Sequence, residues 1–111
     1  MLNENAKKWV AALRSGEYTQ GRGMLCRDDH YCCLGVACEV YKKDGGTLQE
    51  DWTERAVLML QTEPVRLWLG LASENGRIGN DSLAHFNDSG KTFAEIAGLI
   101  ESEPPGLFVE A

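Results

Sequence analysis

The sequence lacks an excess of positive charge. Its 111 residues include 11 lysines and arginines against 17 aspartates and glutamates, which gives a formal net charge of −6. Non-specific binding to nucleic acid depends on basic side chains that neutralise phosphates and release their counterions. We therefore expect no nucleic-acid partner, and the charge suits a protein that meets basic patches on other proteins.

The sequence also lacks a long apolar stretch. No segment approaches the roughly 20 apolar residues that span a bilayer, and residues 1–8 have no apolar core of the kind found in a secretory signal. We expect a cytoplasmic protein without a membrane partner. A reducing compartment disfavours disulfides among Cys26, Cys32, Cys33 and Cys38.

No internal repeat, low-complexity tract or linker divides the chain. A chain of 111 residues with 43% hydrophobic residues can bury one core, whereas two domains would each be too small. We expect a single domain over residues 1–111.

Apolar residues repeat with helical spacing at positions 3–15, 33–43, 64–70 and 92–103. Spacings of three and four residues place such side chains on one helix face. The last segment begins with a capping box formed by Thr92 and Glu95, and segment 33–43 is apolar around most of its circumference, which predicts a buried central helix. The stretch 47–61 is compatible with helix or strand, and we favour a helix.

Turn residues predict β-structure at two places. Residues 24–26 and 31–33 flank the polar turn Arg27–His30, which indicates a short hairpin supported by the helices. Asn75-Gly76 is a second hairpin signal, with Ile78 beyond it as a possible strand. Together these patterns predict a mainly α (α+β) fold, a single small domain of four or five short helices with a small β-hairpin.

The cysteines and one histidine are the most tempting candidates for chemistry. Cys26, His30, Cys32, Cys33 and Cys38 are residue types that zinc takes, but adjacent cysteines do not match the knuckle spacing of structural zinc sites. A free cysteine on an apolar helix behaves as a small hydrophobe. We therefore expect structural thiols, with no metal, no cofactor and no catalytic residue. A small zinc- or thiol-dependent enzyme using His30 with Cys32 or Cys33 is the alternative.

Two polar segments are explained neither by helix periodicity nor by core packing: the loop 15–23 and the turn 86–90. Gly21-Arg22-Gly23 lacks the pattern of a phosphate-binding loop and does not lead directly into a clear helix. His85 and Phe86 lead into residues 87–90 at a helix-to-turn junction, where Asn and Asp normally make local hydrogen bonds, and structural capping is the favoured explanation.

These segments nevertheless form the candidate binding surface. We expect Arg22 to contact a phosphate, an aromatic ring to stack on a base, and the turn to bind sugar hydroxyls. The candidate ligand-binding residues are Tyr18, Gln20, Arg22, Trp68, Asn87 and Asp88.

Three motifs, at residues 12–23 (ALRSGEYTQGRG), 31–38 (YCCLGVAC) and 86–97 (FNDSGKTFAEIA), resemble a family of small proteins common in tailed-phage and prophage genomes. The resemblance implies a phage-encoded accessory protein. By analogy with other small acidic phage proteins without enzyme signatures, we expect a non-catalytic binding protein for counter-defence in the host cytoplasm. Its expected partner is a host defence protein or a nucleotide-type small molecule.

A third hypothesis is a structural or regulatory phage module that acts by oligomerisation. Its contact surface would be an apolar patch that includes Trp52, Leu107 and Phe108.

Overall fold

The computed structural model describes residues 2–22, 25–27, 29–48, 63–73 and 75–109. These ranges contain five helices, α1 (Glu4–Arg14), α2 (Cys33–Lys43), α3 (Glu63–Leu69), α4 (Leu83–Asp88) and α5 (Phe93–Glu101). They also contain five two-residue strands, β1 (Thr19–Gln20), β2 (Cys26–Arg27), β3 (His30–Tyr31), β4 (Arg77–Ile78) and β5 (Asp81–Ser82). The expected mixed, mainly helical fold class is confirmed. The helix favoured for 47–61 falls, from residue 49 onward, outside the described residues.

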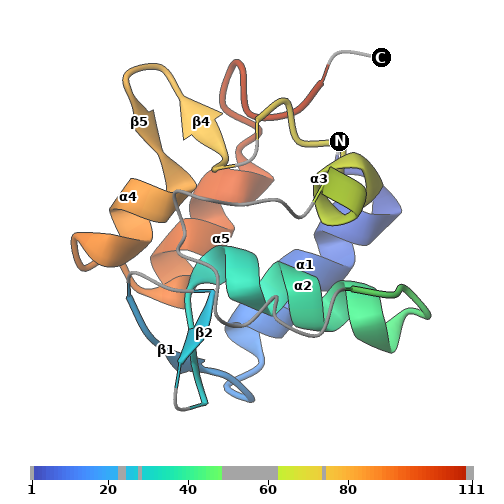
Figure 1. Ribbon diagram of the computed structural model, residues 1–111. Coiled ribbons are helices and arrows are strands. Elements are labelled where there is room, and N and C mark those ends of the chain that lie inside the picture. The colour runs from blue at the N-terminus through green and yellow to red at the C-terminus, as the bar shows by residue number, and fades with distance from the viewer. Residues whose placement is uncertain (1, 23–24, 28, 49–62, 74, 110–111) are drawn as a thin grey trace.

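The helices gather in the middle of the molecule, with the strands β1 and β2 at one end and the β4–β5 hairpin at the other (Figure 1). The predicted apolar stripe of α1 is buried, and this helix packs against α2 and α5. Inside the core, the indole Nε1 of Trp9 donates to the carbonyl of Cys33 at 2.9 Å. Asn3 caps α1 and also donates to the carbonyl of Leu69 at 2.9 Å, so that one side chain joins α1 to α3.

Helix α2 is the buried centre that its sequence predicts. Its first six residues are all buried. A Cβ atom built on Gly35 would lie 1.7 Å from the carbonyl oxygen of Leu25, a distance that no side chain can occupy. Glycine at this position therefore lets the chain before β2 lie directly against the helix.

The first predicted hairpin is confirmed, although it belongs to a larger sheet. Strands β2 and β3 are antiparallel, with Cys26 opposite Tyr31. Strand β1 pairs parallel to β3, giving the order β1-β3-β2. The loop 15–23 was expected to be irregular, and the two-residue strand within it was not predicted, because its pairing partner lies eleven residues further along the chain.

The second hairpin also exists, but its turn was placed wrongly. Strands β4 and β5 pair around Gly79–Asn80, and Gly79 has φ +61. Gly76 lies before β4, is buried, and accepts a hydrogen bond from the amide of Leu83 at 2.9 Å. The positive φ of Gly76, +68, therefore allows the chain to turn tightly where the hairpin packs against the start of α4.

Leu107 and Phe108, near the C-terminal end, pack against the core. Leu107 has no exposed surface, and its carbonyl accepts a hydrogen bond from Ala72 at 2.9 Å. Phe108 forms an isolated antiparallel bridge with Leu71. The proposed oligomerisation patch is therefore wrong for Leu107, which belongs to the core, while Trp52 lies outside the described residues. None of the helices in the described ranges is long and apolar enough to cross a membrane.

Candidate functional site

The two polar segments singled out in the sequence are joined by a hydrogen-bonded clamp between Gln20 and Asn87. The Nε2 atom of Gln20 donates to Oδ1 of Asn87 at 2.8 Å and to the carbonyl of Lys91 at 2.6 Å. The Oε1 atom of Gln20 accepts from the first amide of α5, that of Phe93, at 3.1 Å. One side chain in β1 thus ties this strand to the corner between α4 and α5.

Asn87 completes the clamp from the other side and is fully buried, with 0% of its surface exposed. Its Oδ1 also accepts from the amide of Cys33 at 3.2 Å, and its Nδ2 donates to the carbonyl of Gly21 at 2.8 Å and to Oδ1 of Asp88 at 3.3 Å. The Asn87 amide therefore connects β1, α2 and α4, and it has no surface left with which to touch a ligand.

The small sheet separates its side chains onto two faces. His30 lies opposite Thr19 in β1 and opposite Arg27 in β2, so the three side chains share one face of the sheet. All three are exposed. The opposite row, Gln20, Tyr31 and Cys26, is half-buried and faces the helices. The outward face is consequently polar and basic, and the clamp fixes it from behind.

A pocket of about 270 Å³ lies beside this outward face and is lined by Gly21, Arg22, Arg27 and His30. We call it the arginine pocket. The backbone of Gly21 is held on both sides, because its amide donates to the carbonyl of Tyr31 at 2.7 Å and its carbonyl accepts from Asn87. A Cβ at position 21 would lie 2.7 Å from the Cβ of His30, so the absence of a side chain keeps this wall open.

Within the described ranges, no carboxylate forms an ion pair with the two arginines of this pocket. Neither Arg22 nor Arg27 forms an ion pair with any residue that the structure describes. The guanidinium of Arg22 instead reaches toward the turn after α4, where a Cβ on Gly90 would be 3.6 Å from Nη2. Other basic residues of the described chain form the ion pairs Lys7–Glu4, Lys8–Asp44, Arg14–Glu101, Lys43–Glu17 and Arg66–Glu63, whereas Arg77 donates to the carbonyl of Gly79.

The two aromatic candidates lie outside the arginine pocket. The hydroxyl of Tyr18 accepts from Nζ of Lys43 at 2.8 Å, and its ring meets Tyr31 edge-on with centroids 5.3 Å apart. Tyr18 lines a different hollow, of about 300 Å³, between α1 and α2. Trp68 packs edge-on against Tyr41 in α2, at 5.5 Å, on a helix that lies well away from β1 in Figure 1.

Cys32 and Cys33 have structural partners. The Sγ atom of Cys32 caps α2 by accepting from the amide of Gly35 at 3.3 Å, and the Sγ of Cys33 donates to the carbonyl of Leu83 at 3.6 Å. Burial raises the pKa of Cys32 to about 12 and raises the pKa of Cys33 well above its ordinary value. Both thiols stay protonated at neutral pH, whereas a nucleophile or a zinc ligand needs the thiolate. Within the described ranges, no three histidine, cysteine or acidic residues gather in a way that could hold a metal ion.

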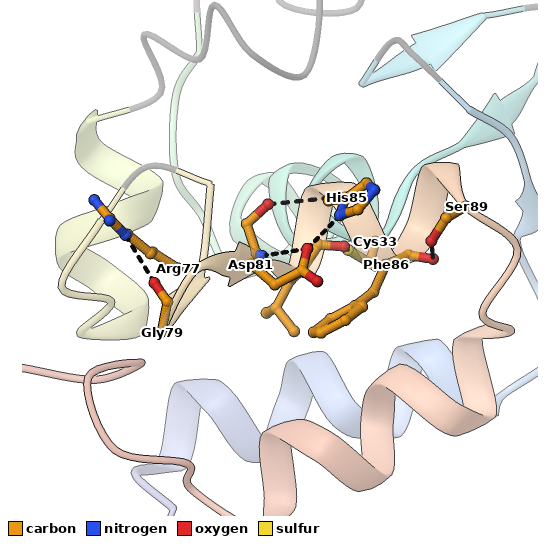
Figure 2. A network of polar contacts seen from close by, with 9 residues as sticks. Cys33, Arg77, Gly79, Asp81, His85, Phe86 and Ser89 are labelled. Atoms are coloured by element: carbon orange, nitrogen blue, oxygen red, sulfur yellow. Dashed lines mark hydrogen bonds and ion pairs between the residues drawn. The ribbon is translucent and has the colours of Figure 1, made fainter.

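A second hollow, of about 320 Å³, lies between the β4–β5 hairpin and α4 and is lined by Asn75, Arg77, Asn80, Asp81, Ser82 and His85. Figure 2 shows the side chains of Asp81 and His85 pointing toward each other, with a hydrogen bond between Nδ1 of His85 and Oδ1 of Asp81. This contact lowers the pKa of Asp81, because the imidazole stabilises the charged carboxylate.

The Asp81–His85 pair braces the start of α4. Ser82 is the helix N-cap, and its hydroxyl accepts from the amide of His85 at 3.1 Å. At the other end of the helix, the hydroxyl of Ser89 donates to the carbonyl of Phe86 (Figure 2). His85 was expected at a helix-to-turn junction, but it lies inside α4, and the residue that caps this helix at its start is Ser82.

The chain belongs to a protein family described as a domain of unknown function (DUF8296), whose model matches residues 1–104. Neither a curated protein nor a solved structure matches it.

The fold therefore brings together part of the predicted site. Gln20, Asn87 and Asp88 meet in or next to the clamp, and Arg22 lies at the adjoining pocket, while Tyr18 and Trp68 are elsewhere. Sequence reasoning missed Arg27 and His30 as pocket residues, because it treated them as the ends of a hairpin turn. The predicted hairpin was the available signal, because pairing of β2 with β3 places Arg27 opposite His30.

Proposed function

We propose that this protein is a phage-encoded accessory protein that acts by binding, without catalysis, in the cytoplasm of the infected host. The motifs at residues 12–23, 31–38 and 86–97 support this origin, since their resemblance to phage and prophage proteins extends over nearly the whole chain. The role is counter-defence: the protein occupies either a nucleotide-type signal or a protein of a host defence system.

One observation carries the binding role. The clamp between Gln20 and Asn87 holds a rigid outward face on which Arg22 and Arg27 flank a pocket and lack a carboxylate partner among the described residues. In a protein whose net charge is −6, such a local concentration of positive charge favours an anionic ligand or an acidic patch on a partner.

The state of the thiols supports binding over the alternative of thiol catalysis. Cys32 and Cys33 have no exposed surface, and burial raises the pKa of each. A substrate could not reach either sulfur without opening of the core, and the thiolate fraction at neutral pH is very small.

Plaque formation tests the proposal. Bacteria carrying a nucleotide-signalling defence system are infected with and without expression of this protein, and we expect expression to restore plaques. The double substitution Arg22→Gln and Arg27→Gln should abolish the rescue without unfolding the protein, because neither side chain has an ion-pair partner in the described chain. Arg77→Gln, which changes an arginine at the second hollow, is the matched control and should rescue like the wild type.

Two outcomes count against the proposal. Full rescue by the double variant would show that the face around the arginine pocket is not the binding surface. Failure of the wild type to rescue against nucleotide-signalling and other defence systems, at verified expression, would refute the counter-defence role.

A further inference from the structure

We infer that the arginine pocket binds a phosphate group of a small molecule. The inference rests on the proposed binding function and narrows it, because it selects the nucleotide-type ligand over the host protein.

The chemistry of the pocket wall fits a phosphate. Arg22 and Arg27 each present a guanidinium, which can donate two parallel hydrogen bonds to phosphate oxygens, and His30 adds an imidazole to the same wall. A phosphate monoester carries nearly two negative charges at neutral pH and so matches two arginines better than a single carboxylate does.

The size of the pocket indicates which part of the ligand it takes. Its volume of about 270 Å³ is just below the 300 to 1,000 Å³ usual for sites that enclose a whole small molecule. Tyr18 and Trp68, the aromatic rings predicted to stack on a base, lie outside it. The phosphate therefore enters the pocket, and the rest of the ligand lies along the exposed row of Thr19 and His30.

The rigidity of the pocket favours binding with little reorganisation. Gly21 is fixed by Tyr31 on one side and by the buried Asn87 on the other. A site that is already ordered loses less conformational entropy when the ligand binds.

A long polyanion fits this site poorly. The chain as a whole carries a net charge of −6, so the overall field of the protein repels a nucleic-acid strand that extends beyond the pocket. A small ligand with one terminal phosphate avoids that repulsion.

The test is a titration of the full chain with AMP and with inorganic pyrophosphate, observed through the arginine Nε–H signals in NMR spectra. We expect saturable shifts for Arg22 and Arg27, and none for Arg77. Arg22→Gln and Arg27→Gln should each weaken AMP binding by about 10-fold to 100-fold, the range for loss of a charge-assisted hydrogen bond. Arg77→Gln should bind AMP as the wild type does.

Other results overturn the inference. Equal shifts with adenosine and AMP, or with sulfate and AMP, would show that the pocket does not select a phosphate group. Saturable binding of a single-stranded oligonucleotide alone would assign the pocket to nucleic acid. If no phosphate compound binds while plaque rescue still depends on Arg22 and Arg27, the inference fails and the proposed function survives with a protein partner. If the rescue is absent as well, both fail.

Discussion

The side-chain amide of Gln20 lies 2.8 Å from that of Asn87, 67 residues further along the chain. This contact joins the first strand to the corner between α4 and α5, and it explains the two polar segments that core packing did not explain. Both residues were predicted to bind a ligand directly. In the folded protein their polar atoms are already engaged with one another, with Cys33, and with the backbone.

Substitution of the clamp should therefore reduce stability. We expect Asn87→Ala to lower the free energy of unfolding by about 3 kcal/mol, since it leaves several buried hydrogen-bonding groups without a partner. Gln20→Ala should cost about 1 to 3 kcal/mol. Urea unfolding measures both, and Ser89→Ala, an exposed change on the same corner, should stay within about 0.5 kcal/mol of the wild type.

The pair should also be energetically coupled. In a double-mutant cycle the two substitutions should deviate from additivity by about 0.5 to 3 kcal/mol, as expected for residues in one hydrogen-bonded network. If Asn87→Ala unfolds at the wild-type urea concentration yet abolishes plaque rescue, Asn87 is a binding residue after all and the clamp is energetically unimportant.

Gly35 should tolerate no side chain. Gly35→Ala places a Cβ 1.7 Å from the carbonyl oxygen of Leu25, and backbone on both sides must move apart. We expect a loss of about 3 kcal/mol or more, comparable with severe overpacking of a core, measured by thermal or urea unfolding.

Gly98 provides the matched control for that substitution. It also lies inside a helix, α5, but a Cβ built there meets nothing within 4 Å. Gly98→Ala should stabilise the protein by up to about 1 kcal/mol, through helix propensity alone. Similar destabilisation by both substitutions would show that the close approach of α2 to Leu25 is not the reason for the stability lost in Gly35→Ala.

The buried thiols should make the protein sensitive to alkali. Burial raises the pKa of Cys32 to about 12 and that of Cys33 well above its ordinary value, so the folded state keeps protons that the unfolded state loses above about pH 8.5. The contribution of these protonated thiols to the free energy of unfolding is complete below that pH and decreases as the pH rises toward 12. The slope is up to about 1.4 kcal/mol per pH unit for each thiol.

Comparison of Cys33→Ala with the wild type isolates the contribution of one thiol to the pH dependence of stability. Cys33→Ala should lose stability at neutral pH through the cavity and the missing hydrogen bond to Leu83, but its stability should fall less steeply with pH than that of the wild type. Equal slopes would contradict the protonated state of Cys33. Rapid labelling of Cys32 or Cys33 by a thiol reagent in the native protein would favour the thiol-enzyme alternative.

The local pattern of the sequence predicted those elements that short-range physics decides. The stripe of α1 and the capping box of α5 are contained in windows of a few residues, and both are confirmed. Helix α4 was missed because its six residues are too few to show a helical period, and the Ser82 cap marks its start only once the hairpin is in place. The turn at Gly79–Asn80 was missed because Asn75-Gly76 is the stronger local signal.

The amino-acid sequence by itself determined the mainly helical class, the buried central helix and the first hairpin, because each follows from spacing between near neighbours. Only the tertiary structure decided the roles of the polar residues. Gln20 and Asn87 became a buried clamp, and Arg22, Arg27 and His30 came to line one pocket, through the parallel pairing of β1 with β3 and the packing of α4 behind it. The clamp joins residues far apart in the chain, and the pocket depends on how the strands pair. No local pattern encodes whether a polar side chain will face a neighbour or the solvent.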